Sequence, residues 1–276
     1  MVGVLAVAFL VWSVILGKFV MKKIFVLAAT MAAFSSSAMA YTQRDVDRLL
    51  NILEKEQANY VTFLSKGYGL SQEVTQAVVS QTVSYLNDHR ITELFLKEAE
   101  ANPKASPETL SMGIAKKGYL RLPPEDVVFA TEFYAKMISS LPDESCKAMS
   151  MGKDTGALSH KPDKNIAAFF ASQNPSDVVR YLCMDSKAIR AEVEALREPA
   201  KNSPRDLKLL QQAFATNYQR ILSSYSELDQ ARMLQAVRDP KGAPACDVCK
   251  AFKMTFKVYE SLDPKMKTVY SYSMGH

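Results

Sequence analysis

Apolar residues recur every three or four positions along most of the chain, which is the spacing of an amphipathic helix. Such stripes occupy Val46–Leu64, Val74–Leu86, Val127–Leu141, Val178–Leu196 and Leu207–Leu222. No Asn-Gly or Asp-Gly turn lies between alternating apolar and polar residues, so no β-hairpin is predicted. We therefore expect an all-α protein, either a multi-helix bundle or an irregular helical array, with about eight to ten helices.

Prolines indicate where several of these helices begin. Proline suits the first turn of a helix, because the amide hydrogen that it lacks has no acceptor there. A Ser, Asn or Asp just before the proline can cap the free backbone amides of that turn. The pattern predicts helix starts at Pro107, Pro175, Pro204 and Pro264, with weaker versions at Pro124 and Pro244.

The least helical stretch of the chain is Ser150–Lys164, which contains two glycines, a histidine and a proline. It predicts an N-terminal helical half over 41–149, a loop or linker over 150–173, and a C-terminal helical half over 174–276 that carries a Cys-x-x-Cys motif. The alternative is a single domain with a long surface loop.

A bacterial secretory signal peptide is indicated near the N-terminus. A basic start at residues 21–23 precedes an apolar run at 24–34 and a small-residue cleavage site at 38–40. This order of charged, apolar and Ala-x-Ala segments is the pattern that signal peptidases process. We expect cleavage between Ala40 and Tyr41, which would make the mature protein periplasmic or secreted.

Residues 1–20 form a second apolar run, long enough to be a membrane-spanning helix. Either Met21 is the true start and these residues are a mis-called upstream extension, or the run is translated as a membrane anchor. We favour the first interpretation, because the signal peptide over 21–40 is complete by itself. After Tyr41 no apolar run reaches spanning length, so we expect no stable membrane span in the mature chain.

The positive charge of the chain belongs largely to this leader. The whole sequence has 34 Lys and Arg against 29 Asp and Glu, a net charge of +5. Three of those lysines, Lys18, Lys22 and Lys23, precede residue 41, so the mature chain has 31 basic residues against 29 acidic ones and a net charge of +2. Without a basic cluster, this balance argues against a nucleic-acid partner.

The four cysteines, Cys146, Cys183, Cys246 and Cys249, carry the most specific chemistry in the sequence. An even number of cysteines in an exported chain predicts disulfide bonds, and four cysteines allow three pairings. We favour Cys146–Cys183 together with Cys246–Cys249, since residues three apart on a helix lie near the separation that a disulfide allows. The fold is therefore expected to be disulfide-braced.

The Cys246-Asp247-Val248-Cys249 motif also has a functional interpretation. At a helix start, the positive end of the helix dipole favours thiolates and would make Cys246 and Cys249 a reactive redox pair. No βαβ pattern surrounds the motif, as a thioredoxin-like site would require. Structural crosslinking is therefore the favoured interpretation.

We expect neither a metal nor a cofactor. Covalent haem attachment requires a histidine directly after the second cysteine of Cys-x-x-Cys, where this chain has Lys250. A four-cysteine zinc site requires two close pairs, and Cys146 and Cys183 are far apart in sequence. The histidines are also too few and too scattered for a ligand set; they are His89, His160 and His276.

The C-terminal segment contains the tyrosines Tyr270 and Tyr272 between serines. Tyrosines in a short polar segment can form a contact surface for a partner, although the alternative is that they pack back on the last helix. No Gly-x-Ser-x-Gly, His-Glu-x-x-His or P-loop motif occurs, so no enzyme class is indicated.

The combined pattern favours an exported helical binding or adaptor protein. It would hold a protein partner of the cell envelope or a small apolar ligand, and its oligomeric state is left open. One alternative is an envelope hydrolase or lyase whose carboxylates converge only in the fold. The other is a thiol–disulfide redox protein that uses Cys246 and Cys249.

Overall fold

The computed structural model describes residues 61–86, 88–102, 105, 107–151, 164–195 and 197–274. Several predictions lie outside these residues. They are those for residues 1–20, for the signal peptide over 21–40 with its cleavage site, and for the stripe before residue 61. The first half of the predicted loop, from 152 to 163, and the histidines His160 and His276 also lie outside them. In the described second half the loop prediction is wrong, because Lys164–Ser172 form a helix that buries Ile166, Phe169 and Phe170.

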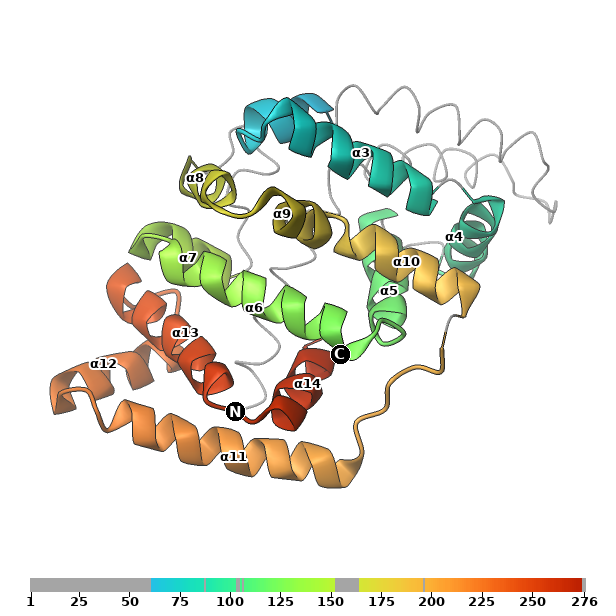
Figure 1. Cartoon of the computed structure of the whole chain (residues 1–276). Coiled ribbons are helices and arrows are strands. Elements are labelled where there is room, and N and C mark those ends of the chain that lie inside the picture. The colour runs from blue at the N-terminus through green and yellow to red at the C-terminus, as the bar shows by residue number, and fades with distance from the viewer. Residues whose placement is uncertain are drawn as a thin grey trace. The chain divides into compact units, whose positions relative to one another are not determined.

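The described residues form one short π-helix, twelve α-helices and no strand, which confirms the all-α prediction (Figure 1). The elements are η1 (Phe63–Gly67), α3 (Gln72–Leu86), α4 (His89–Ala101), α5 (Pro107–Tyr119), α6 (Pro124–Ser140), α7 (Asp143–Ser150), α8 (Lys164–Ser172), α9 (Pro175–Leu182), α10 (Met184–Glu194), α11 (Pro204–Leu222), α12 (Glu227–Arg238), α13 (Ala245–Glu260) and α14 (Pro264–Ser273).

The helices are more numerous and shorter than the eight to ten expected. Between α6 and α7, Leu141 is extended (φ −75°, ψ 142°), as a residue before proline prefers to be. Between α9 and α10, Cys183 leaves the helical range (φ −91°, ψ 3°) and ends one helix while the next begins at Met184. The apolar stripe continues through Cys183, so this second break leaves no signal in the hydrophobic pattern.

The helix starts predicted from prolines are confirmed. Five helices begin at a proline, and Pro244 directly precedes α13. The predicted caps are also present where the structure describes them. The side chains of Asn174, Ser203 and Asp263 accept hydrogen bonds from backbone amides in the first turns of α9, α11 and α14.

By their contacts, the described residues fall into two compact units. Unit 1 contains 123–151 and 200–274, with helices α6, α7 and α11–α14, and unit 2 contains 61–122 and 164–199, with η1, α3–α5 and α8–α10. Each unit thus takes one stretch from either side of residues 152–163. The halves 41–149 and 174–276 stay a prediction about folding domains, because a grouping of contacts does not test independent folding.

Helix α13 is the centre of unit 1, where it packs against α6, α7, α11, α12 and α14. Ten of its residues are buried, and the Phe256 ring meets Tyr134 of α6 edge-on at a centroid distance of 5.6 Å. The Tyr259 ring packs on Tyr270 of α14 at 5.0 Å. Tyr270 and Tyr272 are 1% and 4% exposed, so they do not form the contact surface suggested by the sequence; they pack into the core instead.

Unit 2 is organised around α10, which lies against α5, α3, α4 and α9. The closest of these contacts occurs where Gly118, in the last turn of α5, meets the α10 backbone. A Cβ atom on Gly118 would lie 1.8 Å from the Ala188 carbonyl oxygen and 3.2 Å from Cβ of Glu192. Only a residue without a side chain permits this approach. Arg121, just after α5, adds an ion pair across the same contact, with its Nε 2.7 Å from Glu192 Oε2.

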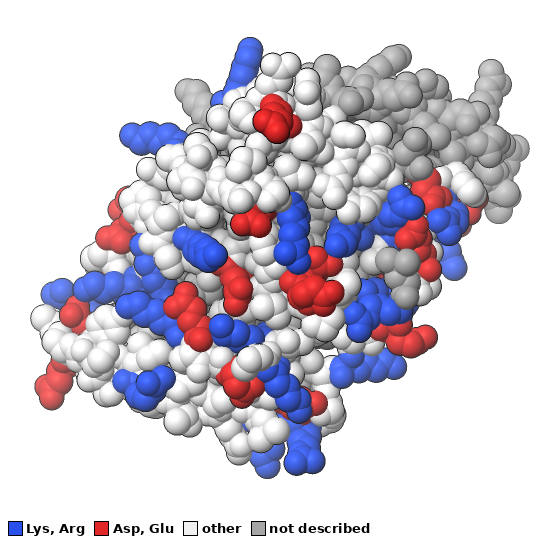
Figure 2. All heavy atoms as spheres, viewed as in Figure 1, with Lys and Arg blue, Asp and Glu red and all other residues white. Residues whose placement is uncertain are grey.

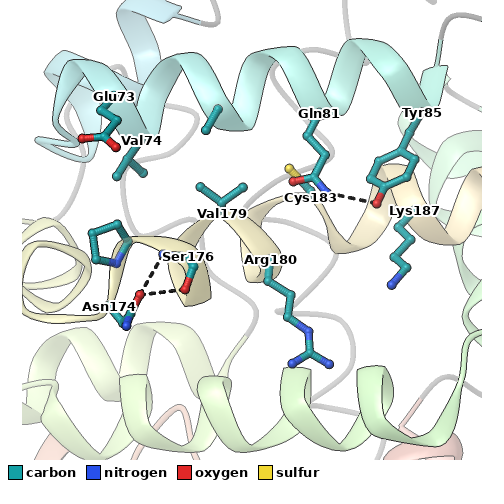
Figure 3. A pocket seen from close by; sticks show the side chains of 12 residues that line it. Glu73, Val74, Gln81, Tyr85, Asn174, Ser176, Val179, Arg180, Cys183 and Lys187 are labelled. Atoms are coloured by element: carbon teal, nitrogen blue, oxygen red, sulfur yellow. Dashed lines mark hydrogen bonds between the residues drawn. The ribbon is translucent and has the colours of Figure 1, made fainter.

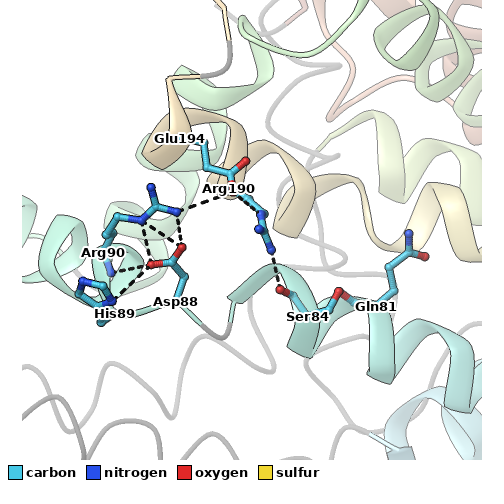
Figure 4. Close-up of polar contacts among 7 residues, drawn as sticks. All are labelled: Gln81, Ser84, Asp88, His89, Arg90, Arg190 and Glu194. Atoms are coloured by element: carbon cyan, nitrogen blue, oxygen red, sulfur yellow. Dashed lines mark hydrogen bonds and ion pairs between the residues drawn. The ribbon is translucent and has the colours of Figure 1, made fainter.

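A polar network fixes the turn from α3 to α4 against α10 (Figure 4). The carboxylate of Asp88 caps α4 by accepting from the Arg90 amide at 2.9 Å, and it also accepts from the Arg90 guanidinium. From α10, Arg190 donates to Glu194 at 2.7 Å and to the carbonyl of Ser84 in α3 at 2.8 Å. Arg90 of α4 also forms an ion pair with Glu194 of α10 at 3.7 Å, so charged contacts join three helices of unit 2 at one corner.

We expect Gly118→Ala to destabilise the protein by about 2–4 kcal/mol, because the added methyl group forces α5 away from α10. Gly113→Ala is the matched control on the same helix, since its Cβ would meet no atom within 4 Å. That substitution should stabilise by about 0.5–1 kcal/mol through helix propensity. Urea unfolding followed by circular dichroism measures both changes, and equal effects would contradict the close crossing.

The Asp88 cap should make stability depend on pH in a defined window. Hydrogen bonds from the Arg90 side chain, then from its backbone amide, lower the Asp88 pKa from 3.8 to about 2 despite the opposing effect of burial. Because the folded pKa is depressed, the contribution is complete above the unfolded pKa near 4 and is lost as pH falls through 2. We expect the difference in unfolding free energy between wild type and Asp88→Asn to shrink over this window.

Arg90→Gln removes the charged partner of Asp88. The unfolding free energy of this variant, measured by chemical denaturation between pH 5 and 2, should therefore depend less on pH than that of the wild type. Asp88→Asn retains an acceptor for the Arg90 amide, whereas Asp88→Ala does not and should lose about 1 kcal/mol more at neutral pH. A pH dependence that is identical in wild type and Arg90→Gln would exclude this ion pair as its source.

Candidate functional site: a groove in unit 2 and a cysteine cluster in unit 1

A groove of about 600 Å³ lies between α3 and the α9–α10 segment of unit 2 (Figure 3). Its walls are mainly apolar. Val74 and Ala77 come from α3, while Pro175 and Val179 come from α9. In Figure 3, Val74 and Val179 lie between the two helices, and polar side chains surround them.

Local sequence explains why α9 presents this wall. Asn174 caps the helix by accepting hydrogen bonds from the amide of Ser176 at 2.9 Å and from its hydroxyl at 2.7 Å. Pro175 then occupies the first helical position with no unsatisfied amide. Val178 is buried while Val179 remains partly exposed, so one valine packs into unit 2 and the other lines the groove.

Charged and amide side chains surround the apolar strip. Glu73 lies at the beginning of α3, and Arg180 and Lys187 lie on the α9–α10 side. Along α3, the Gln81 amide donates to the Tyr85 hydroxyl at 3.1 Å. The groove therefore combines an apolar middle with polar groups of both charges at its edges.

Cys183 contributes sulfur to the groove wall, but its chemistry is suppressed. Its Sγ donates to the Val78 carbonyl at 3.6 Å and lies 3.7 Å from the Thr82 hydroxyl. Burial raises the pKa of Cys183 to about 11, and the hydrogen bond with Thr82 opposes this only in part. The thiol is protonated at neutral pH, so Cys183 acts as an apolar wall residue.

The cysteines pair differently from the favoured prediction. The structure has one disulfide, Cys146–Cys249, which joins α7 to α13 with a Cα–Cα distance of 5.5 Å, while Cys183 and Cys246 are free. The expected Cys146–Cys183 and Cys246–Cys249 bonds are therefore wrong. Cys249 is buried and lies on the side of α13 that packs on α7, whereas Cys246 is exposed one turn earlier.

The free Cys246 is held in place by the first turn of α13 and by the loop before it. It follows Pro244 in the first turn of α13, and its Sγ donates to Oδ1 of the buried Asp247 at 3.7 Å. Lys147, adjacent to Cys146 on α7, donates to the Ala243 carbonyl at 2.6 Å. The loop that precedes Cys246 is thus held to the helix that carries the disulfide partner.

Other features of the described residues define no further site. They contain no group of three His, Cys, Asp or Glu side chains arranged to hold a metal ion. Among them, no helix combines the length and apolarity needed to cross a bilayer. On the face drawn in Figure 2, Lys and Arg are interspersed with Asp and Glu. His89 is exposed at the start of α4, with Nδ1 3.8 Å from Asp88.

Exposed large apolar side chains occur mainly on two helices of unit 1. Five of the six described residues in this class lie on α11 and α12, and Leu228 is the most exposed at 61%. They are Leu207, Leu209, Leu228, Leu234 and Val237.

The chain matches no protein-family model, no curated protein and no solved structure. Any functional conclusion therefore rests on the groove and on the cysteine cluster.

The groove was not predicted from the sequence, although its components were. The stripe beginning at Val74 and the helix start at Asn174-Pro175 each predicted a helix correctly. That α3 and α9 lie against each other is a tertiary contact across about 100 residues of sequence, for which the hydrophobic period has no signal.

Proposed function

We propose that this chain is an exported binding protein that holds a small, mainly apolar ligand in the groove between α3 and α9. The observation that carries the proposal is the groove itself. Its volume, about 600 Å³, lies within the usual range for small-molecule sites, and its apolar walls with a few polar edges are typical of such sites.

The distribution of side chains specifies the ligand further. An apolar body would pack between Val74, Ala77 and Val179, where its surface is removed from water. Glu73 at one edge, and Arg180 and Lys187 at the other, favour a ligand that also has a polar group at an end. Because Cys183 stays protonated, binding rather than covalent chemistry is favoured at this site.

Export is part of the proposal. A long-range disulfide persists in the periplasm or outside the cell, whereas the cytosol keeps most thiols reduced. The Cys146–Cys249 crosslink is compatible with that environment, and the signal-peptide pattern over 21–40 supports it. We place the protein in the periplasm or among secreted proteins, where a partner in the cell envelope is also proposed.

The groove predicts saturable binding of a neutral apolar dye such as Nile red to the mature protein. We expect a fluorescence increase that saturates at one dye per chain. Ala77→Trp should weaken binding at least tenfold, because the indole fills the apolar middle of the groove. Fluorescence titration at constant protein concentration measures both the stoichiometry and the dissociation constant.

Ala231→Trp is the matched control, since Ala231 is likewise an exposed alanine within a helix but lies on α12 of unit 1. It should bind the dye as wild type does. Val179→Gln tests the opposite wall and should also weaken binding. Equal dissociation constants for all four proteins would show that the dye binds elsewhere and would refute the groove as the ligand site.

A further inference from the structure

Three of the four cysteines are close together at the contact between α7 and α13. Cys146 and Cys249 form the disulfide, and the free thiol of Cys246 lies three residues before Cys249 on the same helix. The disulfide cysteines are completely buried, whereas Cys246 is exposed. An accessible thiol thus neighbours an inaccessible disulfide, which is the arrangement needed to transfer oxidation from the core to the surface.

We propose that Cys246, Cys249 and Cys146 form a thiol–disulfide exchange site that moves the crosslink between a buried and an exposed position. The thiolate of Cys246 attacks Sγ of Cys249, and the bond between Cys249 and Cys146 breaks as the new bond forms. Cys246 is oxidised, Cys146 is reduced, and Cys249 remains in a disulfide. The proton lost by Cys246 ends on the departing thiolate of Cys146, so the step needs no external oxidant.

Helix geometry supports this transfer. Residues three apart on a helix have Cβ atoms about 5–6 Å apart, and a disulfide requires about 3.5–4.5 Å, so a small movement of the first turn suffices. Cys246 lies where helix amides have no intrahelical acceptor, so its movement breaks few backbone hydrogen bonds. Cys249, further into the helix, stays in place as the central sulfur.

Two sets of hydrogen bonds hold Cys246 and the loop before it in place. Asp247 accepts a hydrogen bond from the Cys246 thiol at 3.7 Å, which orients the Cys246 side chain. Lys147 holds the loop before α13 through the Ala243 and Lys241 carbonyls, at 2.6 and 3.3 Å. This tether keeps Cys246 near the disulfide while its own side chain remains exposed.

The substrates that fit this site are thiols that can reach the surface of α13. A thiolate attacks Sγ of Cys246 in the transferred Cys246–Cys249 bond, forms a mixed disulfide with Cys246 and releases Cys249 as a thiol. A second thiolate attacks the sulfur of the first thiol in this mixed disulfide. The two thiols leave joined as one disulfide, and Cys246 is restored as a free thiol. Two thiols are thereby oxidised to one disulfide, and the Cys146–Cys249 bond is reduced.

Reduced glutathione is the probe that tests the relay on the folded, oxidised mature protein. We expect the buried disulfide of the wild type to be reduced at least tenfold faster than that of Cys246→Ser, measured by quenching with an alkylating agent and peptide mass analysis. Cys183→Ser is the matched control and should react at the wild-type rate, since Cys183 belongs to unit 2. Equal rates in wild type and Cys246→Ser would overturn the proposal.

A second measurement tests the relay without the Cys246→Ser variant. Cys146→Ser leaves Cys246 and Cys249 as the only cysteines of the cluster, and oxidised glutathione should convert them to the intramolecular disulfide with an unchanged circular dichroism spectrum. Accumulation of a stable mixed disulfide of glutathione with Cys246, without closure onto Cys249, would show that the two sulfurs do not meet in the folded protein and would refute the relay.

Discussion

The crosslink between Cys146 and Cys249 is the one long-range covalent constraint among the described residues, and it ties α7 to α13 at the centre of unit 1. It joins residues 103 positions apart, and the loop that it closes contains every helix from α8 to α12. A loop of this length loses enough unfolded-state entropy to stabilise the fold by about 4–5 kcal/mol in the chain-entropy model. The closed loop includes α9 and α10, which form one wall of the groove, and it begins and ends at the two helices of the exchange site. The bond therefore restricts the unfolded chain over a stretch that includes one wall of the groove and both helices of the exchange site.

Within unit 2, the groove depends on a second constraint, the close crossing of α5 and α10 at Gly118. Because α10 follows α9 with only Cys183 between them, a shift of α10 would carry the wall that contains Val179 with it. The corner formed by Asp88, Arg90 and Arg190 fixes the other wall, α3, against the same helix. A rigid frame behind the groove would reduce the ordering that the proposed ligand must impose on binding. The proposed ligand site and the proposed exchange site lie in different units, so one can be altered without the other.

The features that sequence predicted well are local ones. A proline with a polar residue before it determines the geometry of its own turn, so the starts of α9, α11 and α14 followed from three or four residues each. The disulfide pairing did not follow, because the spacing of Cys246 and Cys249 within one helix favours a local bond between them. Only the packing of α13 on α7 brings Cys249 to Cys146. Tyr270 shows the same limit: its serine neighbours left both a contact surface and packing against the fold open, and the tertiary contacts of α14 bury it together with Ser271. The groove required the contact between α3 and α9, which neither segment encodes alone.

Mass analysis of the protein isolated from the producing cells, with thiols blocked at lysis, tests directly whether the chain is exported as proposed and crosslinked in its core. We expect a chain that begins at Tyr41, a linked peptide pair containing Cys146 and Cys249, and blocking groups on Cys183 and Cys246. A chain that retains residues 21–40 and carries blocking groups on all four cysteines would contradict this expectation.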